Sequence, residues 1–109
     1  MGWLVKDGHV LASLEVASEP KARRRGLLGR NGIEGALLIE RGRWVHTVGM
    51  RFPIDVAFID GQGRVIHCTT MARHRVGIPQ IKARAVIEAE AGAFARWGLA
   101  LGDYLELRS

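Results

Sequence analysis

The chain contains little of what several common protein classes require. Among its 109 residues there is one cysteine, Cys68, so neither an intramolecular disulfide framework nor a multi-cysteine zinc module is available. Serine occurs only at positions 13, 18 and 109, and no Gly-x-Ser-x-Gly nucleophile elbow is present. The longest aliphatic run, Ala36–Ile39, is far shorter than the roughly 20 apolar residues that span a bilayer.

Motifs for targeting, cofactors and metals are also missing from the sequence. No positively charged segment followed by an apolar stretch opens the chain, so we expect a cytoplasmic protein, or an exported one if a leader was removed. Gly61-Gln62-Gly63 is typical of a hairpin turn, and no Walker-type loop is present. The four histidines lack zinc-site spacing, although Asp55 could in principle join His46 and His74. We therefore expect no cofactor, no metal and no membrane association.

The charge balance is basic and unevenly spread. Sixteen lysine and arginine residues, thirteen of them arginine, outweigh eleven acidic residues and give a net charge of +5. Residues 19–51 carry eight basic and three acidic groups, whereas residues 85–109 carry two and four. A basic segment of this kind attracts anionic small molecules, phosphates or an acidic partner. Because aromatic residues make up only 6%, with no basic-aromatic platform, we expect at most weak, non-specific nucleic-acid binding.

Frequent glycine and turn residues divide the chain into short elements. Asp7-Gly8 between two apolar runs predicts a two-residue β-hairpin. Ser18 is suited to cap a helix that reaches about Leu28, with Ala22 and Leu28 facing inward. Short strands are predicted over residues 3–6, 10–16, 36–40, 44–48, 54–59, 64–71, 83–89 and 103–108, a loop over 72–82, and a second helix over 92–97 ended by Gly98.

This succession of elements predicts an α+β fold over residues 1–109, in a single domain. A content of 48% hydrophobic and 25% charged residues is ordinary for a small soluble domain and wrong for a disordered chain. Seven or eight short strands with two short helices favour a mainly antiparallel β-sheet or a partly closed barrel.

Six segments of the chain occur in an order that is typical of one family. They are Arg25–Arg30, Gly35–Ile39, His46–Met50, Pro53–Asp60, Val86–Gly92 and Gly98–Asp103. Over about residues 10–107 the chain resembles a prokaryotic family known as domain of unknown function one hundred and ninety-two. The resemblance implies a β-rich domain, widespread in bacteria and archaea, with no established activity. The chain departs from the common pattern at Thr47-Val48, where an aromatic residue is usual, and its 72–82 loop lacks the cysteines of some relatives.

His46, Met50 and Asp55 are the main candidates for a functional site. A carboxylate inside the apolar run Ile54–Ile59 needs hydrogen bonds or a charged partner, because an isolated buried charge is very unfavourable. If that partner is His46, the pair could perform acid–base chemistry or hold a ligand. Alternatively, Asp55 accepts hydrogen bonds from backbone amides of the turn after Pro53, and His46 is a structural residue. Met50 is more often core filler than a ligand-binding side chain.

Basic side chains complete the candidate site. Arg23-Arg24-Arg25 is either a solvated helix face or an anion-binding group, because guanidinium groups pair well with carboxylates and phosphates. We expect a non-enzymatic binding or accessory domain with a groove for an anionic small molecule or an acidic peptide. The alternatives are a hydrolase that uses His46 and Asp55 as acid and base, and a nucleic-acid accessory protein held by phosphate contacts. The candidate site residues are His46, Met50, Asp55, Arg24, Arg25 and Arg51.

Overall fold

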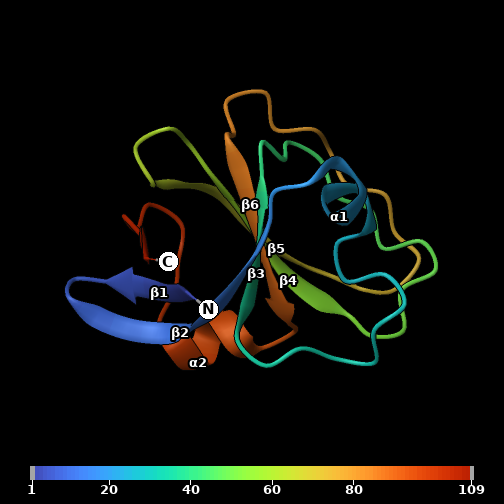
Figure 1. Ribbon diagram of the computed structural model, residues 1–109, viewed down its shortest axis with the longest axis horizontal. Helices are drawn as coiled ribbons and strands as arrows, with labels where there is room; N and C mark the ends of the chain where they lie inside the picture. Colours follow the sequence, from blue (N-terminus) through green and yellow to red (C-terminus); the bar gives the residue numbers. More distant parts are fainter. Residues whose placement is uncertain (1, 109) are drawn as a thin grey trace.

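The computed structural model describes residues 2–108 as seven β-strands in one curled sheet with two short α-helices (Figure 1). The sheet has the strand order β5-β4-β6-β3-β2-β1-β7, and only the β2–β3 pair is parallel. This arrangement confirms the predicted α+β fold with a mainly antiparallel, half-barrel sheet. The elements are β1 (Gly2–Lys6), β2 (His9–Ala17), α1 (Pro20–Arg25), β3 (Ala36–Glu40), β4 (Ile54–Ile59), β5 (Val65–Met71), β6 (Ala85–Glu90), α2 (Ala93–Trp97) and β7 (Glu106–Arg108).

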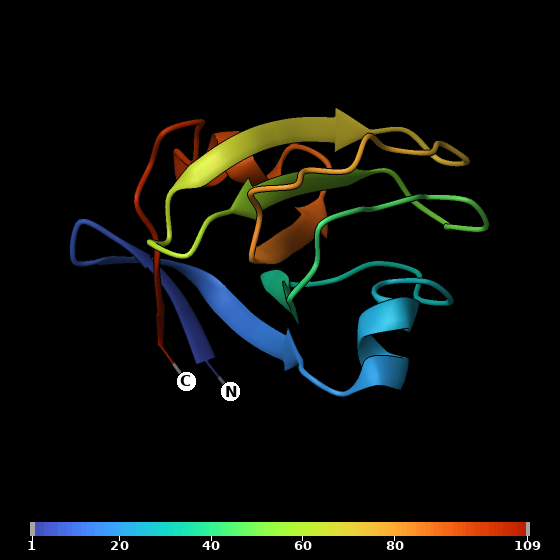
Figure 2. The same ribbon diagram turned by 90° about the horizontal axis from the view of Figure 1, so that it is seen from above.

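The two faces of the sheet carry separate apolar cores. Directly opposed residues of an antiparallel pair share a face, and in the β4–β6 pair Asp55 opposes Ala89 whereas Val56 opposes Glu88. The face of Ala89 packs against Phe94 of α2, and the face of Val56 packs against Leu27, which follows α1. The two helices accordingly lie far apart, on opposite sides of the sheet, as Figures 1 and 2 show.

The chain around α1 determines where a ligand can reach the sheet. The helix begins after Glu19 rather than at a Ser18 cap, and it ends at Gly26, whose φ of 52° and ψ of −127° suit only glycine. Because the chain turns sharply there, Leu27 is the residue that enters the core, with 1% of its surface exposed. The expectation that Ala22 and Leu28 face inward was therefore wrong, since both are exposed.

Residues 44–48 do not form the predicted strand. Both edges of β3 are already paired, with β2 and β6, so the segment after it finds a partner only in the 72–82 loop. A single bridge joins His46 to Val76, and the Thr47 amide donates a hydrogen bond of 2.7 Å to the Arg75 carbonyl.

The last strand is also shorter than the predicted 103–108. Within residues 2–108 no helix is long and apolar enough to cross a membrane.

Candidate functional site

A pocket of about 310 Å³ lies between α1 and the sheet. Its walls come from four segments that are distant in sequence: the end of α1 with the turn after it, β3, the 44–50 loop and β6. The apolar part of the lining consists of Leu27, Leu28, Ile39, Val45 and Met50. The polar part consists of Arg23, Arg24, Arg25, Trp44, His46 and Glu88.

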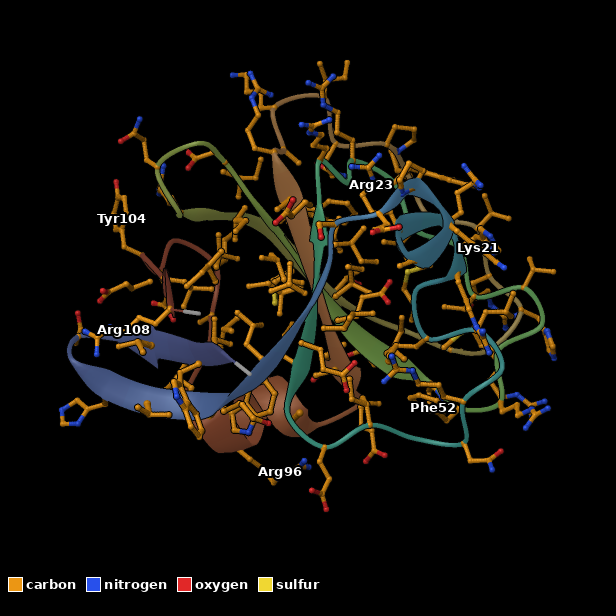
Figure 3. All side chains as sticks on the ribbon, viewed as in Figure 1. Lys21, Arg23, Phe52, Arg96, Tyr104 and Arg108 are labelled. Atoms are coloured by element: carbon orange, nitrogen blue, oxygen red, sulfur yellow. The ribbon has the colours of Figure 1, made fainter. Side chains whose placement is uncertain are left out.

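The three arginines of α1 line the α1 side of this pocket, but they are not equivalent. Arg23 donates a hydrogen bond of 3.1 Å to the Ser18 carbonyl, and Arg25 donates one of 3.2 Å to the Leu28 carbonyl. Arg24 is exposed and makes no hydrogen bond to another group of residues 2–108. Figure 3 shows Arg23 on the side of α1 nearer the sheet and Lys21 on the outer side. Of the three, Arg24 is therefore the one whose guanidinium makes no hydrogen bond within residues 2–108.

The 44–50 loop supplies the wall that faces α1. Trp44 is half-exposed and is fixed by a hydrogen bond of 2.9 Å from its indole Nε1 to the Gly77 carbonyl. The His46 ring lies beside it, with ring centroids 5.3 Å apart, and its Nδ1 accepts a hydrogen bond from the Val48 amide. That bond leaves Nε2 as the nitrogen available to a ligand. Met50 is buried and belongs to the apolar core as well as to the pocket wall.

Glu88 of β6 is the acidic group of the pocket, and the sequence analysis did not select it. Its side chain is 4% exposed. It lies on the same face of the sheet as Leu37 and Val56, its cross-strand partners on β3 and β4. No donor within the described residues forms a hydrogen bond with its carboxylate, which keeps contact with the pocket space. Gly26 covers it so closely that a Cβ atom there would lie 3.2 Å from Glu88 Oε1.

Burial dominates the electrostatics of this carboxyl group. Loss of hydration raises the pKa of Glu88 from 4.5 to about 7, and no neighbouring charge or hydrogen bond offsets the shift. The arginines of α1 are thus close enough to line the same pocket and too far away to act as its counterion. A buried carboxyl with a raised pKa in a concave site is a common property of binding and catalytic sites.

Asp55 lies on the other face of the sheet and is fully engaged. Its Oδ2 accepts hydrogen bonds of 3.0 Å from the amides of Gly92 and Phe94, and its Oδ1 accepts one of 2.6 Å from the Thr70 hydroxyl. The interpretation of Asp55 as an acceptor for backbone amides is therefore supported, but at the start of α2 and not in the turn after Pro53. None of its hydrogen bonds goes to His46.

The structure brings together four of the six predicted site residues. His46, Met50, Arg24 and Arg25 line one pocket, while Asp55 does not, and Arg51 donates a hydrogen bond of 2.9 Å to Asn31 Oδ1 outside it. Glu88 was missed although it carries the same signal as Asp55, a carboxylate inside the apolar run Ala85–Ala89. Within residues 2–108 no cluster of histidine, cysteine and carboxylate side chains is arranged to hold a metal ion.

Two solved structures share this fold. A protein of unknown function from Novosphingobium aromaticivorans DSM 12444 matches with a TM-score of 0.80 and 22% identity, over 96% of this chain and 82% of that one. A protein from Sinorhizobium meliloti 1021, described provisionally as a transcription regulator, matches with a TM-score of 0.80 and 24% identity, over 96% and 90%. At these identities the likeness concerns the fold. No curated protein matches the chain.

The sequence of the chain also matches the profile of one protein family. The match covers residues 3–107, and thus every segment that contributes to the pocket. The family carries the description "Uncharacterized ACR", which assigns it no activity. The chain belongs to this family, domain of unknown function 192 (DUF192).

Proposed function

We propose that this protein is a binding domain for a small organic molecule that combines an anionic group with an apolar body. The observation that carries the proposal is the guanidinium of Arg24, unpaired within residues 2–108, beside a pocket whose buried lining is apolar apart from Glu88. A guanidinium binds a carboxylate or phosphate through paired hydrogen bonds, and the apolar wall gains from covering a hydrocarbon group. The volume of about 310 Å³ suits a compact metabolite better than a drug-sized ligand.

The arrangement of the wall supports recognition of a ligand more than catalysis. The hydrolase alternative needs His46 and Asp55 to act as a pair, whereas Asp55 is occupied by Thr70 and two backbone amides. His46 lies on the pocket, but its Nδ1 is committed to the Val48 amide. We therefore assign His46 a role in holding the anionic group, next to Arg24.

The experiment that tests the proposal is a titration with two carboxylates of suitable size, leucine and 4-methylpentanoate, followed by the amide NMR signals of the protein. We expect saturable shifts in residues 23–28 and 44–50 with at least one probe. Arg24→Ala should weaken that binding roughly tenfold. Arg96→Ala removes an exposed arginine from the other helix and is the matched control (Figure 3). Absence of saturable binding by both probes, or an equal loss in the control, overturns the proposal.

Nucleic-acid binding is the second candidate, and one observation favours it. The 41–51 and 72–82 segments lie side by side and together carry six lysine and arginine residues and no acidic residue. The Sinorhizobium relative with the same fold is described provisionally as a transcription regulator. If phosphates bind here, affinity for a DNA duplex falls steeply as salt rises. We expect only weak, non-specific binding, and a tight complex that persists at physiological salt would make this candidate the leading one.

A further inference from the structure

Glu88 is a second charged group in the pocket, opposite in sign to the arginines. It narrows the chemical class of the ligand further than Arg24 does. The acidic group lies on β6 in the sheet wall, and the basic groups lie across the pocket on α1. Apolar side chains, among them Leu27 and Ile39, line the space that both groups share. A ligand that fills this pocket meets a carboxyl group, hydrocarbon and guanidinium together.

Among residues 2–108, no charged group forms an ion pair with the carboxylate of Glu88. Its neighbours on the adjacent strands, Leu37 on β3 and Val56 on β4, are uncharged. Of the charged groups that line the pocket from α1, Arg23 and Arg25 are held by backbone carbonyls, and Arg24 is exposed to solvent. His46 is the remaining titratable side chain of the wall. A buried ionised carboxylate without a partner is unfavourable, so a cationic ligand group at this place would gain a strong interaction.

We propose that the ligand is a zwitterion of the amino-acid type, with its ammonium group at Glu88, its carboxylate at Arg24 and its apolar side chain against the pocket wall. This inference rests on the proposed function and names the class of ligand. A plain monoanion would leave the Glu88 carboxylate without a partner. A plain amine would meet the arginines of α1, which repel it.

The same arrangement couples ligand binding to a proton. Because burial raises the pKa of Glu88 to about 7, part of the carboxyl population is protonated at neutral pH. An ammonium group at Glu88 favours the ionised form, so a zwitterion releases protons when it binds. A monoanion has the opposite effect, since its charge disfavours ionisation of the same carboxyl.

Three probes that share a 3-methylbutyl group test the inference by calorimetry at neutral pH: leucine, 4-methylpentanoate, which lacks the ammonium group, and 3-methylbutylamine, which lacks the carboxylate. We expect leucine to bind roughly tenfold or more tighter than either truncated probe. Titrations in buffers of different ionisation enthalpy should show proton release with leucine. Glu88→Gln should remove the proton release and the advantage of leucine over 4-methylpentanoate. His9→Gln is the control: it removes an exposed imidazole of β2 that does not line the pocket, and because imidazoles also titrate near neutral pH it should retain both.

Each other result has a defined meaning. If 4-methylpentanoate binds as tightly as leucine, or if leucine keeps its advantage in Glu88→Gln, the ammonium group is not at Glu88 and the inference is overturned while the anion site stands. If 3-methylbutylamine binds as tightly as leucine, the arginines do not contribute and the zwitterion is excluded. If neither leucine nor 4-methylpentanoate binds at millimolar concentration, the proposed function fails and this inference fails with it.

Discussion

The protein buries two carboxylates on adjacent strands, and the two have opposite surroundings. Asp55 on β4 and Glu88 on β6 are each 4% exposed, but they stand on opposite faces of the sheet. Asp55 accepts three hydrogen bonds, whereas Glu88 accepts none from the described residues and faces a pocket. Equal burial therefore does not mean equal compensation of the buried charge.

On our proposal, one face of the sheet serves as scaffold and the other carries the binding site. Asp55 fixes the start of α2 and ties it to β4 and β5, so its burial stabilises the fold. Burial of Glu88 lowers stability at neutral pH, because the ionised form has lost its hydration without gaining a partner. A group that destabilises a fold and borders a cavity is more readily explained by ligand binding than by stability.

Removing the Asp55 carboxylate should have the largest effect on stability. In Asp55→Ala the Gly92 and Phe94 amides lose their acceptor, and we expect a loss of roughly 3–5 kcal/mol in the free energy of unfolding. Urea denaturation measures this change. Thr70→Val removes only one of the three hydrogen bonds and should lose about 1 kcal/mol. A loss below that of Thr70→Val would show that Asp55 does not anchor α2.

Removing the Glu88 carboxylate should increase the free energy of unfolding, and the size of the increase should depend on pH. The folded-state pKa of Glu88, about 7, exceeds the unfolded value of 4.5, so the folded protein binds more protons between these values and its stability falls as pH rises through that window. Glu88→Gln does not titrate and should therefore be more stable than the wild type by up to about 3 kcal/mol at about pH 8. Near pH 4 the difference should be small. A variant that is less stable at both values would mean that the carboxylate has a structural partner.

A methyl group at Gly26 should disturb the same face by an intermediate amount. Gly26→Ala places a side chain at a φ of 52° and within 3.2 Å of Glu88 Oε1, and we expect a loss of roughly 1–3 kcal/mol. Gly8→Ala is the matched control, since Gly8 also has a positive φ, of 78°, but has open space around it. Thermal unfolding of both variants, and of Gly26→Ala in a Glu88→Ala background, separates backbone strain from contact with Glu88. Equal losses would show that the contact with Glu88 contributes nothing.

Removing the Arg24 side chain from the edge of the pocket should have the smallest effect on stability. Arg24 is exposed and makes no hydrogen bond within the described chain, so Arg24→Ala should stay within about 0.5 kcal/mol of the wild type. The same variant is expected to weaken binding of the carboxylate probes. A marked fall in melting temperature would assign Arg24 to the scaffold and make any loss of binding uninformative about the site.

Local patterns in the sequence were sufficient to predict most of the strands and the first turn. Asp7 and Gly8 have positive φ angles of 51° and 78°, which explains why their residue types predict the hairpin. The 44–48 segment shows where such reasoning fails. Its composition favours a strand, but a strand can form there only if β3 has an unpaired edge. Both edges of β3 are paired, and pairing between distant segments cannot be predicted from the local sequence.

The candidate site was predicted in part, for a related reason. Four of the residues selected from the sequence, Arg24, Arg25, His46 and Met50, line one pocket in the structure. Asp55 was selected for being a carboxylate in an apolar run, and Glu88 satisfies the same criterion. The two differ only in the partners that the tertiary structure offers, namely the start of α2 for one and a pocket for the other. Burial of a charge is visible in a sequence, but its compensation is not.

The position of β6 also bears on the order of folding. This strand lies between β4 and β3, which both precede it in the chain, so it joins the β4–β5 hairpin to the unit formed by β1, β2 and β3. During synthesis the arginines of α1 leave the ribosome well before Glu88 does. Joining distant segments is slow compared with hairpin formation, and β6 insertion is therefore a natural late step. A nascent chain that ends before β6 carries Arg23, Arg24 and Arg25 without Glu88, so the binding site that we propose is complete only after β6 has paired with β3 and β4.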